Sequence, residues 1–484
     1  MPAANTRIPE TEVVKTYDLV GVLGIFRTEQ NSGINEHLLF VQDGDVLGKI
    51  DGSVVYSIRR VRALQIVGDG GSEEVESVIN LIESHPFYCT GAEIKECYQW
   101  NSILRRNFNK RTRKQGRRKR VSHSLFVEDK EEQETEFEKN EQNYAIFSDS
   151  DSFSLLNLFS GYYEYQTYRN GSIHYTFEIR SFVSTNKIGP RMLCRGVDED
   201  GNAAFFVKTS FRCNSNQSKN DEPEINFTIF RGSVPLFWAQ TDPLKPSKIW
   251  FEGTEKENSG AFRKHMDQMK QKNEDVVVID LLGHSKYEAI LSQMYREKCC
   301  KQKIKYINFH LNAHINDYEN MKRLLYDKIH RIGADDNGCI LDEETSAESE
   351  ISAFETETLA SYSLLEESEC FSNTPQIDQN RVYRVNCLDC LDRTNLCQFL
   401  IFNYHNPYKF NIVKSMWKNN GNALAQLYTG SQALKSDFSK EKKRSLLSRV
   451  NDIMISANRM INNKFNDGEK QRVIDLLLKG GNGK

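Results

Sequence analysis

Long apolar runs are missing from this sequence of 484 residues. None approaches the roughly 20 apolar residues that a helix needs to cross a bilayer, and the richest stretch, residues 276–282, has the length of a strand. The polar first residues lack the apolar segment of a signal peptide, and Pro2 excludes a myristoylation signal. We therefore expect a cytoplasmic protein that reaches any membrane from solution.

A strong net charge and a disulfide framework are also missing. The formal net charge of −3 and the 38% of hydrophobic residues exclude a disordered polyelectrolyte and a protein that binds nucleic acid over its whole surface. No nucleic-acid partner is expected, and protein partners are left unassigned. The 11 cysteines are odd in number and scattered, which indicates thiols in a reducing compartment.

The length suits two domains. We expect a flexible segment at 1–15, a β-rich amino-terminal domain at 16–185 and an α/β domain at 186–480. Strand-like apolar runs separated by Gly, Asp and Asn indicate the first domain, and residues 73–83 have helical spacing. Near the end, apolar positions in 446–454 predict a helix that faces the core, with lipid headgroups as the alternative contact.

Two charged stretches interrupt this pattern. In residues 105–120, ten of the sixteen side chains are Lys or Arg, and an acidic block at 128–141 follows. We expect 105–141 to be a mobile insertion and 342–369 to be a second, acidic loop, because neither can build a core. Three interpretations of the basic run are open: it is a solvated loop, it binds anionic membranes, or it is a nuclear or nucleic-acid targeting signal. The membrane-binding residues would be Arg117, Arg118, Lys119 and Arg120.

The informative segment is residues 381–399, RVYRVNCLDCLDRTNLCQF. Residues 382–385 have a strand pattern, and an apolar helical face begins at Leu396, with Thr394 or Asn395 as the candidate N-cap. Between them, Cys387 is followed by five residues and then by Arg393. The segment therefore predicts a strand, a loop and a helix that carry Cys-x5-Arg-Thr.

This spacing has a chemical rationale. Five residues can curl so that their amides point at one phosphate, where the helix also presents its positive end. Arg393 can bind two phosphate oxygens, and the same positive field lowers the pKa of a thiol below its usual value of about 8.5. We expect Cys387 to be the nucleophile of a phosphocysteine mechanism that needs no cofactor. Either Asp389, which we prefer, or Asp392 would protonate the leaving group.

The remaining loop residues are expected to bind the phosphate or support those that do. Thr394 has a hydroxyl that could donate to the cysteine sulfur. Cys390 could resolve an oxidised Cys387, although packing in the core is the favoured interpretation. The complete set of phosphate-loop residues predicted beside the catalytic ones is Asn386, Leu388, Cys390, Leu391, Thr394 and Asn395.

The full string from Arg384 to Asn395 resembles the signature of the Sac-domain phosphoinositide phosphatases, R-x-N-C-x-D-C-L-D-R-T-N, at every fixed position. The resemblance extends over about residues 17–478 and includes GVLGIF at 21–26, RMLCRGVDEDGNAAFFV at 191–207 and RGSVPLFW at 231–238. The end of the chain is similar to the Sac domain of synaptojanins, without their 5-phosphatase domain and without a membrane hairpin.

The resemblance implies a Sac amino-terminal subdomain followed by an α/β catalytic domain. It also implies a phosphatase, peripheral on the cytosolic face of anionic membranes, that hydrolyses phosphatidylinositol 4-phosphate or 3-phosphate. The alternative from another class is a phosphoinositide-binding or scaffolding module with little activity. A protein phosphatase shares the Cys-x5-Arg chemistry but not the string.

Two short segments depart from the family pattern. Residues 208–210 are Lys-Thr-Ser where an acidic Glu-Thr-Glu run is common, and residues 308–310 are Asn-Phe-His where Asp-Phe-His is expected. His310 is interpreted as structural rather than catalytic. For Cys387, the alternatives are a buried structural thiol, half of a zinc site with Cys390, or a redox pair; no metal site is expected, since no second Cys-x2-Cys exists.

Overall fold

The structure is a computed structural model. It describes residues 19–30, 33–68, 72–124, 154–216, 225–240, 248–270, 275–314, 317–334, 338–340, 381–406, 410–430 and 467–481. The expectations for residues 1–15, for the acidic stretches 128–141 and 342–369 and for a helix at 446–454 lie outside these ranges. In the described ranges no helix combines the length and the apolar character that crossing a bilayer requires.

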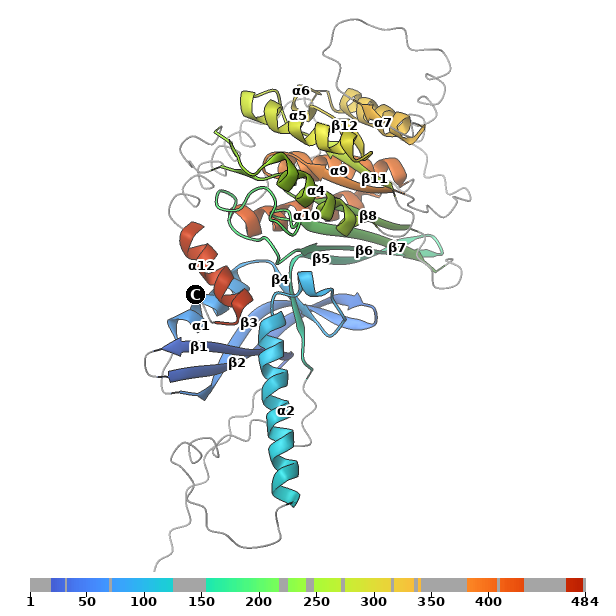
Figure 1. Ribbon diagram of the computed structural model, residues 1–484. Coiled ribbons are helices and arrows are strands. Elements are labelled where there is room, and N and C mark those ends of the chain that lie inside the picture. Colours follow the sequence, from blue (N-terminus) through green and yellow to red (C-terminus); the bar gives the residue numbers. More distant parts are fainter. Residues whose placement is uncertain are drawn as a thin grey trace, which may run out of the picture.

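One twelve-stranded sheet organises the described chain, with the strand order β1-β2-β3-β4-β5-β6-β7-β8-β14-β11-β12-β13 (Figure 1). The first eight strands pair antiparallel: β1 (Gly21–Gln30), β2 (Gly33–Ile50), β3 (Ser53–Val67), β4 (Phe87–Thr90), β5 (Asn157–Asn170), β6 (Ile173–Val183), β7 (Val207–Ser215) and β8 (Ile225–Arg231). The last four are parallel: β14 (Arg381–Asn386), β11 (Asp275–Asp280), β12 (Lys305–Asn308) and β13 (Cys339–Ile340). The mixed α/β architecture confirms the predicted fold class.

Strand β5 joins the two parts of the sheet. Its first residues pair with β4 up to Ser160, and from Gly161 onward it pairs with β6. Gly161 has φ +143°, and a Cβ at this position would lie 2.0 Å from the carbonyl oxygen of Ser181. Only glycine fits this close approach of two backbones. The division of the chain at residue 185, directly after β6, stays a prediction.

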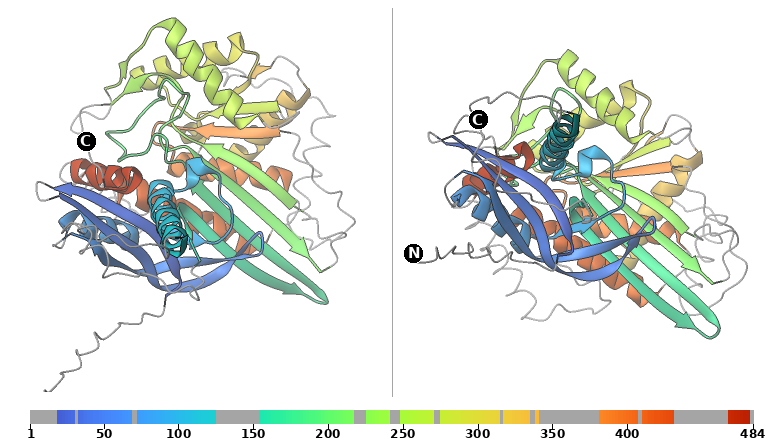
Figure 2. Two further views of the ribbon diagram at one scale, coloured as in Figure 1. Left: turned by 60° about the horizontal axis from the view of Figure 1, so that its bottom comes forward. Right: turned by 90° about the horizontal axis from the view of Figure 1, so that it is seen from below.

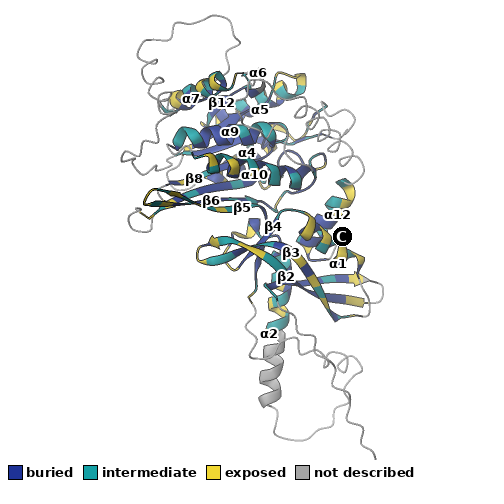
Figure 3. Cartoon of the chain, turned by 180° about the vertical axis from the view of Figure 1, so that it is seen from behind, coloured by how far each residue is buried: buried dark blue, intermediate teal, exposed yellow. Residues whose placement is uncertain are grey.

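Helices cover both faces of the parallel part of the sheet. On one face, α4 (Glu255–Met269) and α5 (Lys286–Lys301) pack against β11, β12 and β14. On the other face lie α7 (Tyr318–Ala334), α9 (Asp392–His405) and α10 (Asn411–Thr429). In Figure 3 buried residues concentrate on the strands between these helices. The parallel strands are therefore buried on both sides, as their continuous apolar runs require.

The carboxy-terminal helix returns to the amino-terminal strands. Helix α1 (Glu73–Ser84) begins at its N-cap Ser72 and buries Val75, Val78, Leu81 and Ile82, which confirms the helical spacing predicted for 73–83. Helix α12 (Asp467–Lys479) packs against α1, and its Val473 and Leu477 enter the same core (Figure 2). Four short elements complete the description: the 3-10 helix η1 (Glu96–Tyr98), α6 (Leu311–His314) and the paired strands β9 (Trp238–Ala239) and β10 (Trp250–Phe251).

The basic run forms a helix, which corrects the expectation of a mobile loop at residues 105–120. Helix α2 (Ser102–Ser124) begins against β1 and extends away from the amino-terminal strands (Figure 1). Leu104 and Asn107 are buried, Phe108 packs on the neighbouring apolar cluster, and Arg111 pairs with buried Glu36. These contacts recur at helical spacing, so tertiary packing supports a helix that composition alone disfavours. The side chains of Arg117–Arg120 lie outside the described part.

Candidate active site

The predicted motif lies at the middle of the sheet. Strand β14 pairs with β8 on one side and β11 on the other, and it ends at Asn386. Helix α9 begins at Asp392, five residues after Cys387. The strand and the helix are thus confirmed, but the N-cap is Leu391 rather than Thr394 or Asn395. Because the helix begins earlier than predicted, the amides of its first turn are directed at the loop that precedes it.

Cys387 is buried at the start of the loop, and its sulfur accepts a hydrogen bond from the backbone N–H of Cys390 at 3.1 Å. The chain makes this return because Cys390 adopts the left-handed conformation, with φ +55°. Such a conformation is strained for a residue with a side chain and is a feature of functional loops. The loop thus directs a backbone N–H at the sulfur of the predicted nucleophile.

Cys390 itself has a different environment. Its Sγ donates to the carbonyl oxygen of Gly232 at 2.9 Å, and it also lies 3.3 Å from the carbonyl oxygen of Cys387. Burial raises the pKa of the Cys390 thiol to about 12. This thiol therefore stays protonated near neutral pH, and Cys387 stays the predicted nucleophile of the pair.

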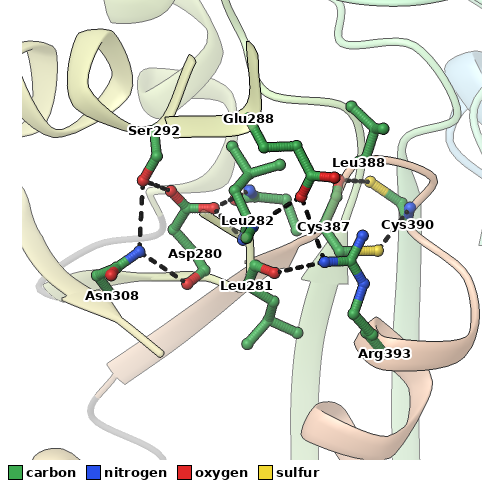
Figure 4. A network of polar contacts seen from close by, with 12 residues as sticks. Asp280, Leu281, Leu282, Glu288, Ser292, Asn308, Cys387, Leu388, Cys390 and Arg393 are labelled. Carbon is green, nitrogen blue, oxygen red and sulfur yellow. Dashed lines mark hydrogen bonds and ion pairs between the residues drawn. The ribbon is translucent and has the colours of Figure 1, made fainter. Parts of the chain in front are cut away.

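Arg393 lies beside the loop in the first turn of α9. Its Nη1 donates to the carbonyl oxygen of Leu281 at 2.9 Å and lies 3.4 Å from Oε2 of Glu288. Figure 4 shows the guanidinium next to the sulfur of Cys387. The spacing in the sequence thus brings the predicted nucleophile and the predicted phosphate-binding cation together.

Asp389 is held between two arginines that the sequence analysis did not assign. Arg195 Nη2 lies 2.6 Å from Oδ1 of Asp389, and Arg191 Nη1 lies 3.0 Å from its Oδ2. Burial opposes ionisation, but the two guanidinium groups outweigh it and hold the pKa of Asp389 well below its usual value. In this arrangement Asp389 is a carboxylate and a poor proton donor, which leaves Asp392, half-buried at the start of α9, as the other predicted acid.

Arg195 also ties the loop to the neighbouring chain segments. Its Nη1 donates to the carbonyl oxygen of Leu388 at 2.9 Å, and its Nη2 donates to Gln240 at 2.7 Å. Its guanidinium carbon lies 5.5 Å from the centre of the Trp238 ring. Arg195, Trp238 and Gln240 line a cavity of about 720 Å³, which also has Asp198 on its wall.

A buried polar network supports the loop from below. Asn386 donates to Asp280 at 2.8 Å and accepts from Arg384 at 3.1 Å. Asp280 also accepts from the hydroxyls of Ser292 at 2.7 Å and Tyr306 at 2.8 Å (Figure 4). Burial raises the pKa of Asp280, while these donors act in the opposite direction. Asn386 therefore links the loop to β11, and its predicted place in a phosphate loop stays a prediction.

The same network explains the departure at position 308. The amide nitrogen of Asn308 lies 3.3 Å from the hydroxyl of Ser292, which itself donates to Asp280. A second carboxylate at 308 would lie next to the buried Asp280 and would repel it. Asn308 is the uncharged residue that this buried carboxylate permits.

Three further residues of the sequence analysis, Asn395, Thr394 and His310, contact neighbouring elements of the fold. Asn395 accepts from Arg231 at 2.9 Å and donates to the carbonyl oxygen of Trp417 at 3.1 Å, so it fastens α9 to β8 and α10. Thr394 is fully buried, and within the described residues its hydroxyl has no hydrogen-bond partner, so the predicted bond to the Cys387 sulfur is absent. The ring of His310 lies against that of His284, with centroids 3.6 Å apart.

Strand β14, the Cys-x5-Arg segment and the N-terminus of α9 follow one another here, an arrangement typical of proteins that bind phosphate at a helix N-terminus. The SacI homology domain matches residues 20–316, so the chain belongs to the SacI homology family. The matched range ends before Cys387, and the assignment of the loop residues rests on their geometry.

Several curated proteins are similar to this chain. "Inositol-1,4,5-trisphosphate 5-phosphatase 1" of Schizosaccharomyces pombe is 31% identical over 318 residues, which cover 62% of this chain and 26% of that protein. "Phosphatidylinositide phosphatase SAC2" of Homo sapiens is 28% identical, over 61% of this chain and 25% of that protein. "Phosphatidylinositol-3-phosphatase SAC1" of Saccharomyces cerevisiae is 27% identical, over 61% and 47%. The chain thus spans between a quarter and a half of the length of these relatives.

Proposed function

We propose that this chain hydrolyses phosphate monoesters on the inositol ring of phosphoinositide lipids, with Cys387 as the nucleophile. The observation that carries the proposal is the hydrogen bond from the backbone N–H of Cys390 to the sulfur of Cys387, which also interacts electrostatically with Arg393 at the start of α9 (Figure 4). A thiolate there lies next to donors that bind phosphate oxygens. The names of the relatives support an inositol phosphate or phosphoinositide as the substrate.

The reaction proceeds in two displacements. The Cys387 thiolate attacks phosphorus, the bond from phosphorus to the inositol oxygen breaks, and Asp392 gives its proton to that oxygen. Water then attacks the phosphocysteine, gives a proton back to the carboxylate, and releases inorganic phosphate and the thiolate. Arg393 and the loop amides stabilise the negative charge on the phosphoryl oxygens in both transition states.

We further propose phosphatidylinositol 4-phosphate or 3-phosphate as the substrate and the cytosolic face of an anionic membrane as the place of action. The name of one relative, "Phosphatidylinositol-3-phosphatase SAC1", supports a monophosphorylated lipid, and the basic end of α2 provides charge for a peripheral contact. The carboxylates of the cavity beside Arg195 offer acceptors for the hydroxyl groups of an inositol ring, and Phe237 and Trp238 offer apolar contacts.

The test is phosphate release from a panel of short-chain phosphoinositide isomers. Phosphotyrosine peptides are tested separately as alternative substrates, and EDTA is present throughout. We expect release from a monophosphorylated lipid and none from the peptides. Lipid binding without release would instead indicate a binding or scaffolding module. Release from the peptides alone would contradict the proposed substrate class.

A further inference from the structure

Glu288 meets the catalytic loop from a distant part of the chain. It lies in the first turn of α5, and its Oε2 accepts a hydrogen bond from the backbone N–H of Gly283 at 2.7 Å. The same oxygen lies 3.4 Å from Nη1 of Arg393. The side chains of Glu288 and Arg393 are only 16% and 21% exposed, so solvent screens this pair little.

Within the described residues, the hydrogen bonds and the ion pair of the Arg393 guanidinium are made by one of its three nitrogens. Nη1 donates both to the carboxylate of Glu288 and to the carbonyl oxygen of Leu281 (Figure 4). Within the described part of the chain, no hydrogen bond or ion pair engages Nε or Nη2 of this residue. The edge formed by Nε and Nη2 is one that can bind two oxygens of a phosphate at once.

We infer that Glu288 is a positioning residue for Arg393, an inference that rests on the proposed phosphatase function. It holds Nη1 at the back of the site and so presents the opposite edge of the guanidinium to the phosphate. A long side chain without such an anchor samples many rotamers and reaches the phosphate in the correct geometry less often. Glu288 uses its carboxylate only as an acceptor here and does not touch the reacting atoms.

The anchor has a second consequence. The backbone N–H of Gly283 holds the carboxylate of Glu288. The carbonyl oxygen of Leu281, just after β11, accepts a hydrogen bond from the same Nη1 of Arg393. The orientation of Arg393 is thus set by the segment that follows β11, more than 100 residues before the loop. Since an orienting contact acts mainly in the transition state, its loss should lower kcat more than it raises KM.

The experiment compares Glu288→Gln with Glu297→Gln. Glu297 is on the same helix but exposed, where it accepts from Gln293. On a short-chain phosphoinositide we expect Glu288→Gln to lower kcat about tenfold with KM changed less than about twofold, and Glu297→Gln to leave both unchanged. In an Arg393→Lys background, Glu288→Gln should cause no further loss, because the geometry that it supports is already gone.

A second readout is independent of turnover. Tungstate, a phosphate-like oxyanion, should bind Glu288→Gln about tenfold more weakly than it binds the wild type or Glu297→Gln, as measured by calorimetry on folded protein. Equal tungstate affinity and equal kcat in wild type and Glu288→Gln would overturn the inference. An inactive wild type whose tungstate affinity still falls about tenfold in Glu288→Gln would overturn the proposed reaction instead, and a chain that neither turns over lipid nor binds tungstate would overturn both.

Discussion

The backbone nitrogen of Cys390 lies 3.1 Å from the sulfur of Cys387, and the left-handed φ of Cys390 makes this contact possible. The loop is therefore already curled around the position where a phosphate would bind. The conformation is unfavourable for a residue with a Cβ, and the bonds from Arg195 to Leu388 and from Cys390 to Gly232 help to hold it. A pre-formed loop needs little reorganisation when charge develops in the transition state.

The pair of Asp389 and Arg195 should contribute to stability. Asp389→Asn leaves the buried Arg195 without its ion partner and should lower the free energy of unfolding by about 3 kcal/mol at pH 7, measured by urea denaturation. The exposed Asp275→Asn is the matched control, with a change below about 0.5 kcal/mol. A stability loss no larger than that of the control would contradict the ion-pair assignment.

The same pair predicts a dependence on pH. Because the two arginines lower the pKa of Asp389 in the folded state, its contribution is complete above the unfolded pKa of about 3.9 and is lost as the pH falls below that value. The difference in unfolding free energy between wild type and Asp389→Asn should thus be constant from pH 7 to pH 5 and shrink below pH 4. A difference that instead grew on acidification would mean that Asp389 is protonated in the folded protein.

The two aspartates of the loop can be distinguished by the leaving group. Asp392→Asn should lower turnover of a phosphoinositide about 10²–10⁴-fold, because the inositol oxygen departs poorly without a proton. The same variant should hydrolyse p-nitrophenyl phosphate almost normally, since that leaving group needs no acid. Asp389→Asn should affect both substrates alike. A selective loss on the lipid in Asp389→Asn would restore Asp389 as the proton donor.

The basic end of α2 is expected to bind anionic membranes without taking part in the chemistry. Deleting all of residues 105–120 would also remove Asn107, which donates to the carbonyl oxygen of Ile25, and Arg111, which pairs with Glu36. The appropriate variant therefore replaces only Arg117, Arg118, Lys119 and Arg120 by Ala. Each cation near an anionic surface contributes about 1 kcal/mol at most.

The measurement is sedimentation with anionic vesicles. The four replacements should weaken it more at low salt than at high salt, and hydrolysis of a soluble short-chain substrate should not change. Neutral vesicles are the control. Unaltered sedimentation at low salt would mean that the basic end of α2 is only a solvated surface.

The central part of the site was predictable because it is local in sequence. Cys387 and Arg393 stand one loop apart, and the strand-like run at 382–385 and the apolar positions from Leu396 onward indicated the strand and the helix that flank them. Glu288, Arg191, Arg195 and Asp280 were missed because they reach the loop only through tertiary packing. Only the resemblance of residues 191–207 to a family segment singled out the two arginines, and it assigned them no role.

Helix α2 shows why composition was misleading. Ten Lys and Arg residues in sixteen indicated a solvated loop, and the apolar and polar contacts at Leu104, Asn107, Phe108 and Arg111 were hidden among them. Such a stripe is visible as helical spacing only when Asn and Arg are counted as buried residues. Their burial depends on the carbonyl of Ile25 and the carboxylate of Glu36, which the local sequence does not reveal.

The most direct test of the central claim is to trap the covalent intermediate. Wild-type protein mixed with a phosphoinositide and quenched in acid within one turnover should carry a phosphoryl group on the peptide that contains Cys387, detected by mass spectrometry. Cys390→Ser should retain this group, and Cys387→Ser should show neither the adduct nor phosphate release while unfolding at the wild-type temperature. Phosphate release by folded Cys387→Ser at the wild-type rate would contradict the phosphocysteine mechanism.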